Sequence, residues 1–352
     1  MTSLLDQPEF LGALVAGGRS RAIAAGVDPN EYDAITAGLG TASQWSSAFR
    51  AAGAVHRGQA EAAEQAGHLI SAADAYLAAA ACAHVATTLP TGDRAGHHEA
   101  ATAMHRALAL FEPPVQHLRG QTFRGTLTPQ PHDPSAPVVV IVPGLDSSQV
   151  EFHSNAVALH RRGLATLTID GPGQGELAPD TAMRADYHVV VTEALDTLLA
   201  TGIRPHAIGV MALSLGGFFG TVALAREQRL TAGVIVSGPS RLVWDELPEL
   251  VQAIFALRAG GHDAARALVA EVDVDTIAPT LAQPLLVIDG ELDVIPGGIN
   301  GGRLATLAPH GRHLVIPGGD HLLGNRRWQW LPRAADFLHD QLTQQAAAPP
   351  RG

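Results

Sequence analysis

Six short runs of apolar residues, rich in Val, Ile and Leu, recur between residues 136 and 317, separated by Gly/Pro turns and helical stretches. The runs are APVVVIV (136–142), LATLTI (164–169), HAIGVMAL (206–213), AGVIVS (232–237), PLLVID (284–289) and HLVIP (313–317). Strands that are apolar along their whole length are typical of sheets covered on both faces. Because helical stretches alternate with them, the pattern predicts an α/β fold with a mostly parallel, doubly wound sheet.

The first 112 residues show a different pattern, with apolar positions three and four residues apart in an Ala-rich context. This spacing predicts helices over 48–67 and 69–89. Almost nothing in this stretch is typical of a strand, so we expect an all-helical N-terminal cap domain over residues 1–112.

Pro113 and Pro114 end the helical pattern, and the stretch 115–130 is typical of a hairpin that leads into the sheet. We expect the α/β domain to span 113–347. Between its fourth and fifth apolar runs lie about 45 residues (239–283) with a helical pattern, more than a single crossover connection needs. We interpret this segment as a helical lid.

Charge and hydropathy exclude several kinds of partner. The formal net charge is −11, the pI is near 5.8, and the chain contains no basic block, so we expect neither nucleic acid nor an anionic membrane as a partner. The N-terminus lacks the basic start of a secretory signal, and no apolar run approaches the roughly 18 residues of a membrane span. We expect a cytoplasmic protein that acts on a small-molecule substrate.

Cysteine and histidine usage argues against a metal site. Cys82 is the only cysteine, which excludes an intramolecular disulfide, and we expect it to be a small buried residue of an Ala-rich helix. None of the 17 histidines pairs with another at H-x-x-x-H spacing. We expect no metal and no cofactor, and we expect His97 and His98 to face solvent.

The stretch GVMALSLGGFFG (209–220) passes from a predicted strand to a predicted helix at Ser214. A strand that reverses into a helix within a few residues holds the serine in strained backbone geometry and needs small neighbours, here Ala212 and Gly216. The pattern is G-x-S-x-G with Ala in place of the first Gly. Alone, the pattern favours a serine that caps the following helix over a catalytic serine.

Two further strand ends favour a catalytic serine. Asp293 follows PLLVI in the turn DGELDVIP, and His321 follows HLVIP in GGDHLLGN. The order Ser, Asp, His along the chain, each after its own strand, predicts a triad in which His321 moves the Ser214 proton and Asp293 orients the imidazole. Asp289 and Asp320 are the rival acids; we favour Asp293.

An oxyanion hole needs two backbone N–H groups beside the serine. Leu215, directly after the serine, supplies one candidate. The other is Leu145 in VPGLDSS, where Gly144 permits close backbone approach. The same loop also fits a plain strand-to-helix turn capped by one of its serines, Ser147 or Ser148.

The Gly-rich stretch TIDGPGQGE (168–176) lacks the context of a dinucleotide-binding motif, which opens a helix after a first strand. We interpret it as a tight turn held by Asp170 through backbone N–H groups.

The motifs PGLDSS, DGPGQGE, ALSLGG, GELD and GGDH, in this order behind an Ala-rich helical prefix, resemble the α/β-hydrolase superfamily. More narrowly, the chain resembles the branch that includes 2,6-dihydroxypseudooxynicotine hydrolase and the esterase-like fermentation-respiration switch proteins. The resemblance implies an α/β-hydrolase fold whose helical prefix covers the mouth of the site, and it covers nearly the whole chain.

Carried over by position, the resemblance implies that Tyr76, His84 and Trp45 belong to the substrate pocket. It also implies an auxiliary acid in the lid, for which WDELPEL offers Asp245 and Glu246, although an exposed lid helix explains both equally well. Members of this branch are often dimers.

The sequence therefore predicts a serine hydrolase that cleaves a small to medium apolar acyl or β-dicarbonyl substrate at an ester or C–C bond. A C–C substrate would need a donor for a second oxygen, such as His84 or an indole N–H. One alternative keeps the triad but transfers the acyl group within a biosynthetic pathway, as a cyclase or acyltransferase does. Another is a non-catalytic interaction protein.

Overall fold

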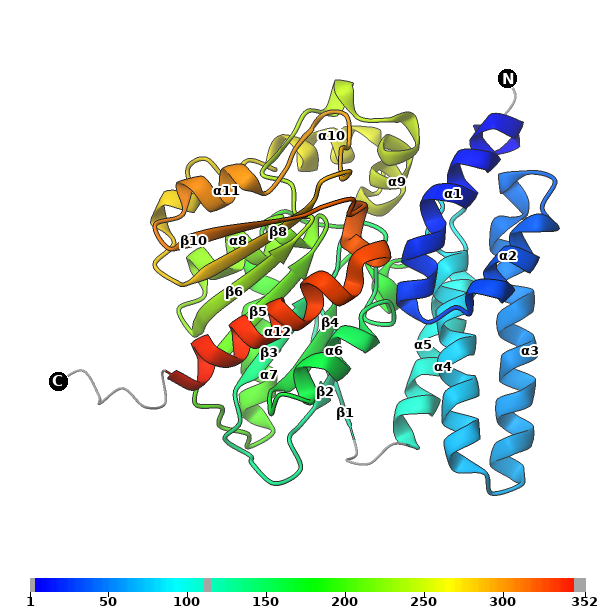
Figure 1. Ribbon diagram of the computed structural model, residues 1–352, viewed down its shortest axis with the longest axis horizontal. Coiled ribbons are helices and arrows are strands. Elements are labelled where there is room, and N and C mark those ends of the chain that lie inside the picture. Colours follow the sequence, from blue (N-terminus) through cyan, green and yellow to red (C-terminus); the bar gives the residue numbers. More distant parts are fainter. Residues whose placement is uncertain (1–3, 111–114, 345–352) are drawn as a thin grey trace.

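The computed structural model describes residues 4–110 and 115–344 and contains a column of helices beside an α/β layer structure (Figure 1). The helical part precedes the sheet in the chain, as predicted. Its helices are α1 (Pro8–Ala25), α2 (Pro29–Ala37), α3 (Trp45–Gln65), α4 (Leu69–Ala86) and α5 (Arg94–Ala109). The carboxylates of Asp28 and Asp93 accept backbone N–H groups at the starts of α2 and α5, which fixes where these helices begin.

Helix α4 lies at the centre of this helical part, between α3 and α5. Its alanines let the neighbouring helices approach closely, and most of its side chains from Ala72 to Ala86 are buried, including Cys82. By length and mean hydropathy (1.5) α4 could cross a membrane, which corrects the expectation that no segment reaches that size. Because 61% of the helix is buried inside the protein, its apolar character is explained by core packing.

The sheet has eight strands in the order β1-β2-β4-β3-β5-β6-β8-β10. The strands are β1 (Gln116–Arg119), β2 (Arg124–Thr128), β3 (Val138–Val142), β4 (Ala165–Asp170), β5 (Ile208–Leu213), β6 (Leu230–Val236), β8 (Leu285–Gly290) and β10 (Gly311–Ile316). All six predicted apolar runs are strands, and they pair in parallel. The predicted hairpin is β1 and β2, the antiparallel pair at one edge.

Helices cover both faces of the sheet, which explains the continuous apolar strands. On one face, β3 places Val139 and Ile141 against α6 (His153–His160) and α12 (Arg327–Gln344). On the other face, Val138, Val140 and Val142 pack toward the second group of helices. That group consists of α7 (His188–Ala200), α8 (Gly216–Arg226) and α11 (Gly302–Leu307).

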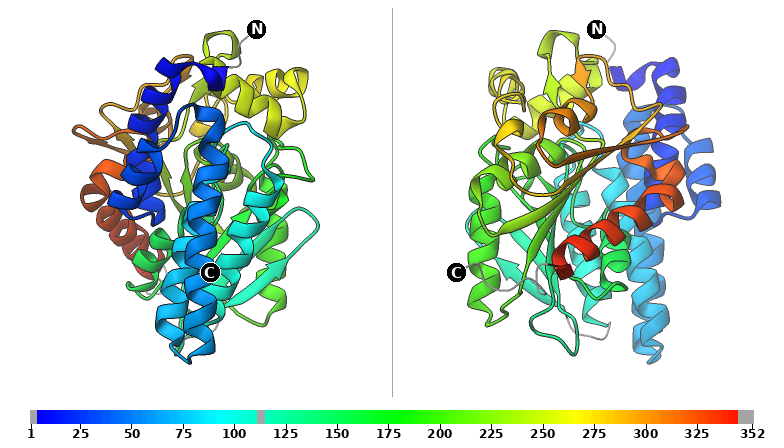
Figure 2. Two further views of the ribbon diagram at one scale, coloured as in Figure 1. Left: turned by 90° about the vertical axis from the view of Figure 1, so that its right-hand side faces the viewer. Right: turned by 60° about the vertical axis from the view of Figure 1, so that its left-hand side comes forward.

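The predicted lid is a helical insertion between β6 and β8. It contains β7 (Arg241–Leu242), α9 (Glu249–Ala259) and α10 (His262–Ala270), and β7 pairs with β9 (Gly298–Ile299) beyond it. The two helices lie above the carboxyl ends of the strands, and α9 is on the side of the helical part (Figures 1 and 2). Leu250 of α9 packs into the apolar cluster formed by α1, α2, α3 and α4, so the lid and the helical part contact each other directly.

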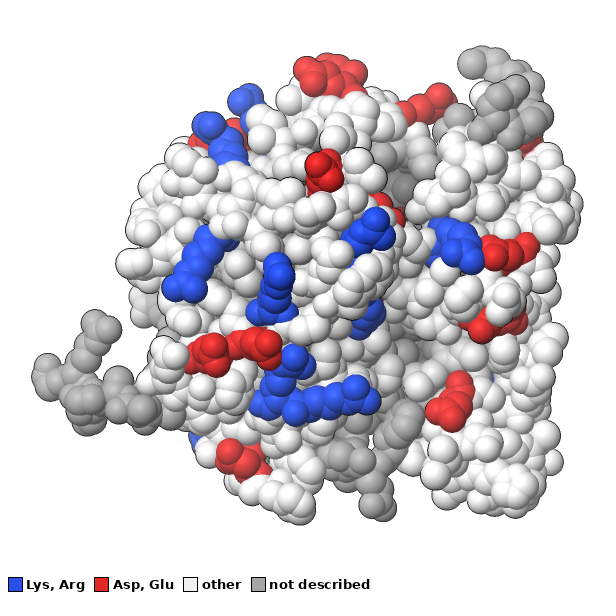
Figure 3. Space-filling view, in the orientation of Figure 1, with Lys and Arg blue, Asp and Glu red and all other residues white. Residues whose placement is uncertain are grey.

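Charged side chains of both signs are interspersed on the face of the molecule shown in Figure 3. Several form short ion pairs across elements, such as Arg162 with Asp336 on α12. No extensive single-sign patch is visible on that face.

Candidate active site

Ser214 lies in the turn between β5 and α8, at the carboxyl edge of the sheet. Its φ is 55°, a left-handed conformation that is uncommon for a residue other than glycine. A Cβ atom at Gly216 would lie 2.6 Å from the carbonyl oxygens of Val142 and Pro143, so only glycine fits there. Gly144 has nearly as little space, since a Cβ there would lie 2.8 Å from the Cβ of Ser214. The turn is therefore built from the small residues that the sequence pattern predicts.

The structure brings together the three side chains predicted to form a triad. The Oγ of Ser214 lies 2.9 Å from Nε2 of His321, and Nδ1 of the same imidazole lies 2.8 Å from Oδ1 of Asp293. His321 follows β10 at the start of a 3₁₀ helix (His321–Arg326), where the next residue, Leu322, donates its N–H to Ser237 Oγ. Asp293 is buried, and its carbonyl accepts from Asn300 Nδ2, which fixes the turn after β8.

Asp293 dominates the electrostatics of the imidazole. Loss of water around His321 would lower its pKa, but the hydrogen bond and negative charge of Asp293 outweigh this effect, so the pKa is raised above 6.5. Neither rival acid contacts the ring. Asp289 binds His313 (Oδ2–Nε2, 2.8 Å), and Asp320 accepts from Ser20 Oγ of α1 (2.5 Å).

Two backbone N–H groups beside Ser214 have no acceptor in the described part of the chain. Among the described residues, none accepts a hydrogen bond from the amide of Leu145 or from that of Leu215, although both residues are buried. Buried amides without a partner are rare in folded proteins. Because Gly144 lies against Ser214 and Leu215 follows it, these two amides are the candidates for an oxyanion hole.

The Gly-rich turn after β4 holds the loop that carries Leu145. Gln174 donates from Nε2 to the carbonyls of Pro143 (2.7 Å) and Gly144 (2.8 Å), and its Oε1 accepts from Tyr187 Oη (2.6 Å). Asp170 accepts from the backbone N–H groups of Gln149 (2.7 Å) and Glu176, as expected. Burial raises the pKa of Asp170 to about 6.

A cavity of about 320 Å³, which we call the triad cavity, lies between the helical part, the lid and His321. His84 and Trp45 line it, as the family resemblance implies, together with apolar side chains of α1 and α9. The indole N–H of Trp45 already donates to the Val85 carbonyl (2.9 Å), and both ring nitrogens of His84 are bonded, to Ser148 Oγ (3.0 Å) and Glu151 Oε2 (3.2 Å). Neither residue therefore has a free donor for the second oxygen that a C–C substrate would require.

Two other predicted pocket residues lie elsewhere. Tyr76 lines a separate groove on the outer side of the helical part, where its hydroxyl donates to Glu64 Oε2 (3.0 Å). Tyr76 and His84 are eight residues apart on α4, yet only His84 faces the sheet domain. Glu246 is exposed in the lid, and Asp245 beside it pairs with Arg266 (3.0 Å), so both acids fit the alternative of an exposed lid segment.

Arg21 of α1 is the main site residue that sequence reasoning missed. Its guanidinium lines the triad cavity and donates to Glu151 (2.6 and 2.9 Å) and to Asp146 (2.7 Å). Ser147 Oγ also accepts from it (3.2 Å), so Ser147 and Ser148 bind the helical part rather than cap a helix. Burial would raise the pKa of the Glu151 carboxyl, but Arg21 and His84 hold it far below its usual range.

Possible metal ligands gather in one place among the described residues. Glu31, His56 and Cys82 have their ligand atoms within 4.8 Å of one another, inside the helical part. Ordinary hydrogen bonding accounts for two of them, because His56 Nε2 contacts both oxygens of Glu31 (2.8 and 2.9 Å). Burial raises the pKa of the Cys82 thiol to about 12, so it is protonated, whereas metals bind the thiolate.

One histidine prediction is wrong. His98 is exposed as expected, but His97 is buried, and its Nε2 accepts a hydrogen bond from Arg258 of the lid (2.9 Å). Its position on α5 faces the lid, which the local sequence pattern does not reveal.

The arrangement can perform nucleophilic chemistry without a cofactor. A hydroxyl bonded to a neutral imidazole can lose its proton while it attacks a carbonyl carbon, and a buried carboxylate on the far side stabilises the imidazolium that forms.

Known proteins resemble this chain both in sequence and in fold. Residues 133–267 match the family model described as "Serine aminopeptidase, S33". Over 292 residues, 78% of this chain and 78% of the relative, the chain is 30% identical to 2,6-dihydropseudooxynicotine hydrolase of Paenarthrobacter nicotinovorans. The crystal structure of 2,6-dihydroxy-pseudo-oxynicotine hydrolase superposes with a TM-score of 0.82 at 26% identity, covering 94% of this chain and 98% of that one.

A further solved structure, AbyA5, has a TM-score of 0.64 at 19% identity and covers 97% of this chain and 95% of its own; this likeness concerns the fold alone. The agreement in sequence and fold extends over the helical part as well as the sheet. This chain belongs to the α/β-hydrolase family and is a hydrolase.

Proposed function

We propose that this hydrolase is a cofactor-independent serine enzyme that cleaves an ester or C–C bond in a small to medium, mainly apolar acyl or β-dicarbonyl compound. One observation carries the proposal: Ser214, His321 and Asp293 form a continuous hydrogen-bonded chain at the carboxyl edge of the sheet. The similarity to a hydrolase of a small organic molecule supports a small-molecule substrate.

In the proposed reaction, Ser214 Oγ attacks the substrate carbonyl carbon while His321 Nε2 takes the hydroxyl proton. The amides of Leu145 and Leu215 donate to the oxygen that becomes negative. Collapse of the tetrahedral intermediate expels the leaving group, which receives the proton from His321. Water, deprotonated by the same imidazole, then attacks the acyl carbon and releases the product acid, and Ser214 Oγ regains its proton from His321.

The lining of the triad cavity favours an apolar acyl chain. Besides its charged residues, the cavity presents aliphatic side chains from three elements, Leu14 of α1, Leu89 after α4, and Leu250 and Ile254 of α9. A volume of about 320 Å³ suits a ligand of modest size.

Ester and C–C cleavage differ in the leaving group. An ester expels an alkoxide, whereas a β-diketone expels a carbanion that is stable only as the enolate of the neighbouring carbonyl. A panel of esters and β-diketones with the same acyl chain distinguishes the two reactions, because it gives kcat/KM for each bond type on one acyl group.

The proposal is tested by Ser214→Ala. Loss of the nucleophile should lower kcat by a factor of about 10⁴ to 10⁶, and the wild-type protein, but not the variant, should form a stoichiometric adduct with a fluorophosphonate. Circular dichroism of the variant serves as the control for folding. Retention of most activity by Ser214→Ala would refute the serine mechanism.

The fate of the acyl group is a separate question. In water labelled with ¹⁸O, hydrolysis places the label in the product acid. A product without label would instead show that a second substrate group captures the acyl chain, as in a cyclase or acyltransferase.

A further inference from the structure

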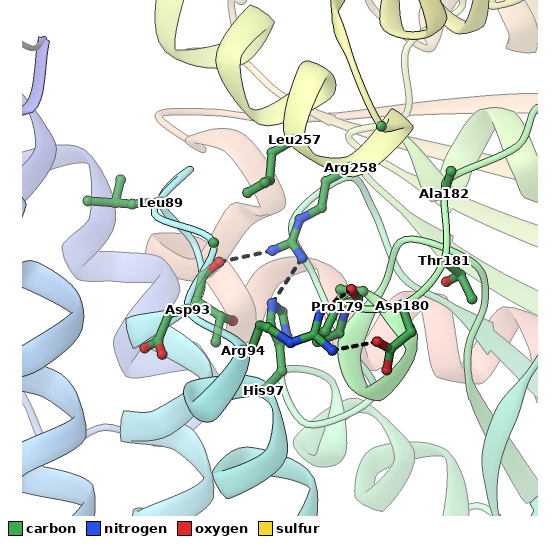
Figure 4. Close-up of a pocket in the computed structure, with 14 residues that line it drawn as sticks. Leu89, Asp93, Arg94, His97, Pro179, Asp180, Thr181, Ala182, Leu257 and Arg258 are labelled. Atoms are coloured by element: carbon green, nitrogen blue, oxygen red, sulfur yellow. Dashed lines mark hydrogen bonds and ion pairs between the residues drawn. The ribbon is translucent and has the colours of Figure 1, made fainter.

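A second cavity of about 330 Å³ lies between the helical part and the lid, and we call it the Arg258 recess. Arg258 enters it from α9, His97 and Arg94 from the start of α5, and the loop 178–182 closes the remaining side (Figure 4). None of these residues takes part in the mechanism proposed above.

Arg258 is a buried cation without an acidic partner among the described residues. It is 4% exposed, and its pKa is lowered because burial disfavours the charged form. Its guanidinium makes two hydrogen bonds, to His97 Nε2 (2.9 Å) and to the Thr87 carbonyl (3.0 Å). Both acceptors are neutral: His97 accepts at Nε2, and burial beside Arg258 lowers its pKa to about 3.

Arg258 retains unused donors in this position. A guanidinium has five N–H groups, and two are bonded here, which leaves three. Its Nε is buried and has no hydrogen-bond partner among the residues that the structure describes. A buried charge normally has a counter-ion, so an arginine in this state has the donor capacity and the charge to bind an anion.

The other charged residues of the recess have partners of their own. Arg94 on the rim pairs with Asp180 (2.5 Å) and donates to the Pro179 carbonyl. Asp93 accepts from the Gly96 N–H at the start of α5 and lies 3.5 Å from Arg50 outside the recess, although its Oδ2 has no hydrogen bond. Arg258 is therefore the lining charge without an acid in ion-pair contact among the described residues, and Asp146 attracts it only from a longer distance. One unit of charge matches a monoanion better than a dianion.

The recess and the triad cavity are neighbours along one face of α9. Leu250 and Ile254 line the triad cavity, and Leu257 and Arg258 line the recess. These positions are spaced at i, i+4, i+7 and i+8, so they share one side of the helix. With a rise of about 1.5 Å per residue, Arg258 lies only about 6 Å along the axis from Ile254. Leu89 lines both cavities.

We propose that the substrate is an acyl compound with a carboxylate at the end remote from the scissile bond, and that Arg258 binds this carboxylate. The inference rests on the proposed function. The reacting carbonyl lies at Ser214, the apolar middle of the molecule lies along Leu250 and Ile254, and the carboxylate lies in the recess. The planar guanidinium suits a carboxylate because both groups are flat and can form two parallel hydrogen bonds.

The experiment compares two series of p-nitrophenyl esters of increasing chain length, one ending in a carboxylate and the other in the matching primary amide. At the chain length that reaches Arg258, wild-type kcat/KM should be about 10- to 100-fold higher for the carboxylate. Arg258→Gln should remove this preference, because the ratio of the two kcat/KM values is unaffected by a general loss of activity. Arg266→Gln, a change of an exposed lid arginine, should retain it.

A second measurement covers the case in which Arg258→Gln fails to fold. Simple aliphatic carboxylates should competitively inhibit the wild-type hydrolysis of the p-nitrophenyl ester that ends in an amide. Chloride replaces the carboxylate in the control, so that the ionic strength stays constant. Three results would each overturn the inference. The first is an equal kcat/KM for the carboxylate and amide series at every chain length, and the second is a carboxylate preference that Arg258→Gln retains. The third is carboxylate inhibition that is not competitive. If the wild-type protein hydrolyses none of the esters, the result contradicts the proposed function. Carboxylate binding in the Arg258 recess is then tested separately: carboxylates should raise the Tm of the wild-type protein but not that of Arg258→Gln.

Discussion

At the scale of single residues, the Asp293 carboxylate sets the pH range in which His321 can work. Only the neutral imidazole can accept the Ser214 proton, and Asp293 stabilises the imidazolium, so the pKa of His321 is raised above 6.5. The active fraction of free enzyme therefore increases as pH rises through that pKa. We expect the acidic limb of the kcat/KM profile to have its midpoint above pH 6.5.

Asp293→Asn removes the negative charge, so the residual activity should show its acidic midpoint at lower pH, in addition to a drop in kcat of about 10⁴. Asp289→Asn is the matched control, because Asp289 binds His313 and not His321. A wild-type midpoint at or below 6.5, or an unshifted midpoint in Asp293→Asn, would contradict the electrostatic account.

The residue scale also shows where sequence reasoning succeeds. Ser214, Asp293 and His321 could be brought together from sequence because each follows a strand, and the ends of parallel strands meet at one edge of a sheet. Arg21 carries no such signal. Its partner Glu151 is 130 positions away, and the contact depends on how α1 packs on the loop after β3. The prediction that Tyr76 lines the substrate pocket was wrong for a related reason. An Ala-rich helix gives little indication of which of its sides faces the site.

At the scale of elements, α1 is attached to the catalytic loop by a buried ion pair. Arg21 donates to Glu151, whose side chain is 4% exposed. Removing one partner of such a pair leaves the other charge buried without compensation, which costs about 3–5 kcal/mol. We therefore expect Arg21→Met to lower the free energy of unfolding by about this amount, as measured by urea denaturation.

Arg19 on the same helix provides the control. Its pair with Asp33 is 44% and 54% exposed, and water and salt screen exposed pairs, so Arg19→Met should change stability little. Equal losses in both variants would show that the helix, rather than the buried pair, accounts for the effect. Partial recovery of stability in the double variant Arg21→Met, Glu151→Met would support the pair further, because Glu151 is then no longer a buried charge without a partner, whereas Asp146 still lacks Arg21.

Elements were more predictable than the contacts between them. The apolar strands follow from burial on both faces, and the helical lid follows from its length and pattern. The short pair β7 and β9 has too few residues to leave a pattern. The Gly-rich turn after β4 was recognised as a turn, but its support of the loop at Leu145 through Gln174 needs the folded structure.

At the scale of the whole molecule, the helical part, the lid and the sheet domain are joined by polar contacts around the two cavities. Arg21 joins α1 to the loop after β3, Arg258 joins the lid to α5, and Arg94 joins α5 to the loop 178–182. The sequence predicts three parts but not these connections, because each bond joins residues distant in the chain. The connections indicate that the helical part does not open independently.

Cys82 tests this expectation, since it is the only thiol and lies at 0% exposure in the core of the helical part. Burial also raises its pKa to about 12, so the reactive thiolate is nearly absent in the native state. Labelling by Ellman's reagent should therefore be negligible in the native protein and should appear at the same urea concentration at which far-UV circular dichroism reports global unfolding. If Cys82 reacts at lower urea, the helical part opens while the sheet domain stays folded. Access to the triad cavity would then depend on that opening. Arg21→Met removes the contact between α1 and the loop after β3, so it should lower the urea midpoint of labelling by more than the urea midpoint of the circular dichroism change.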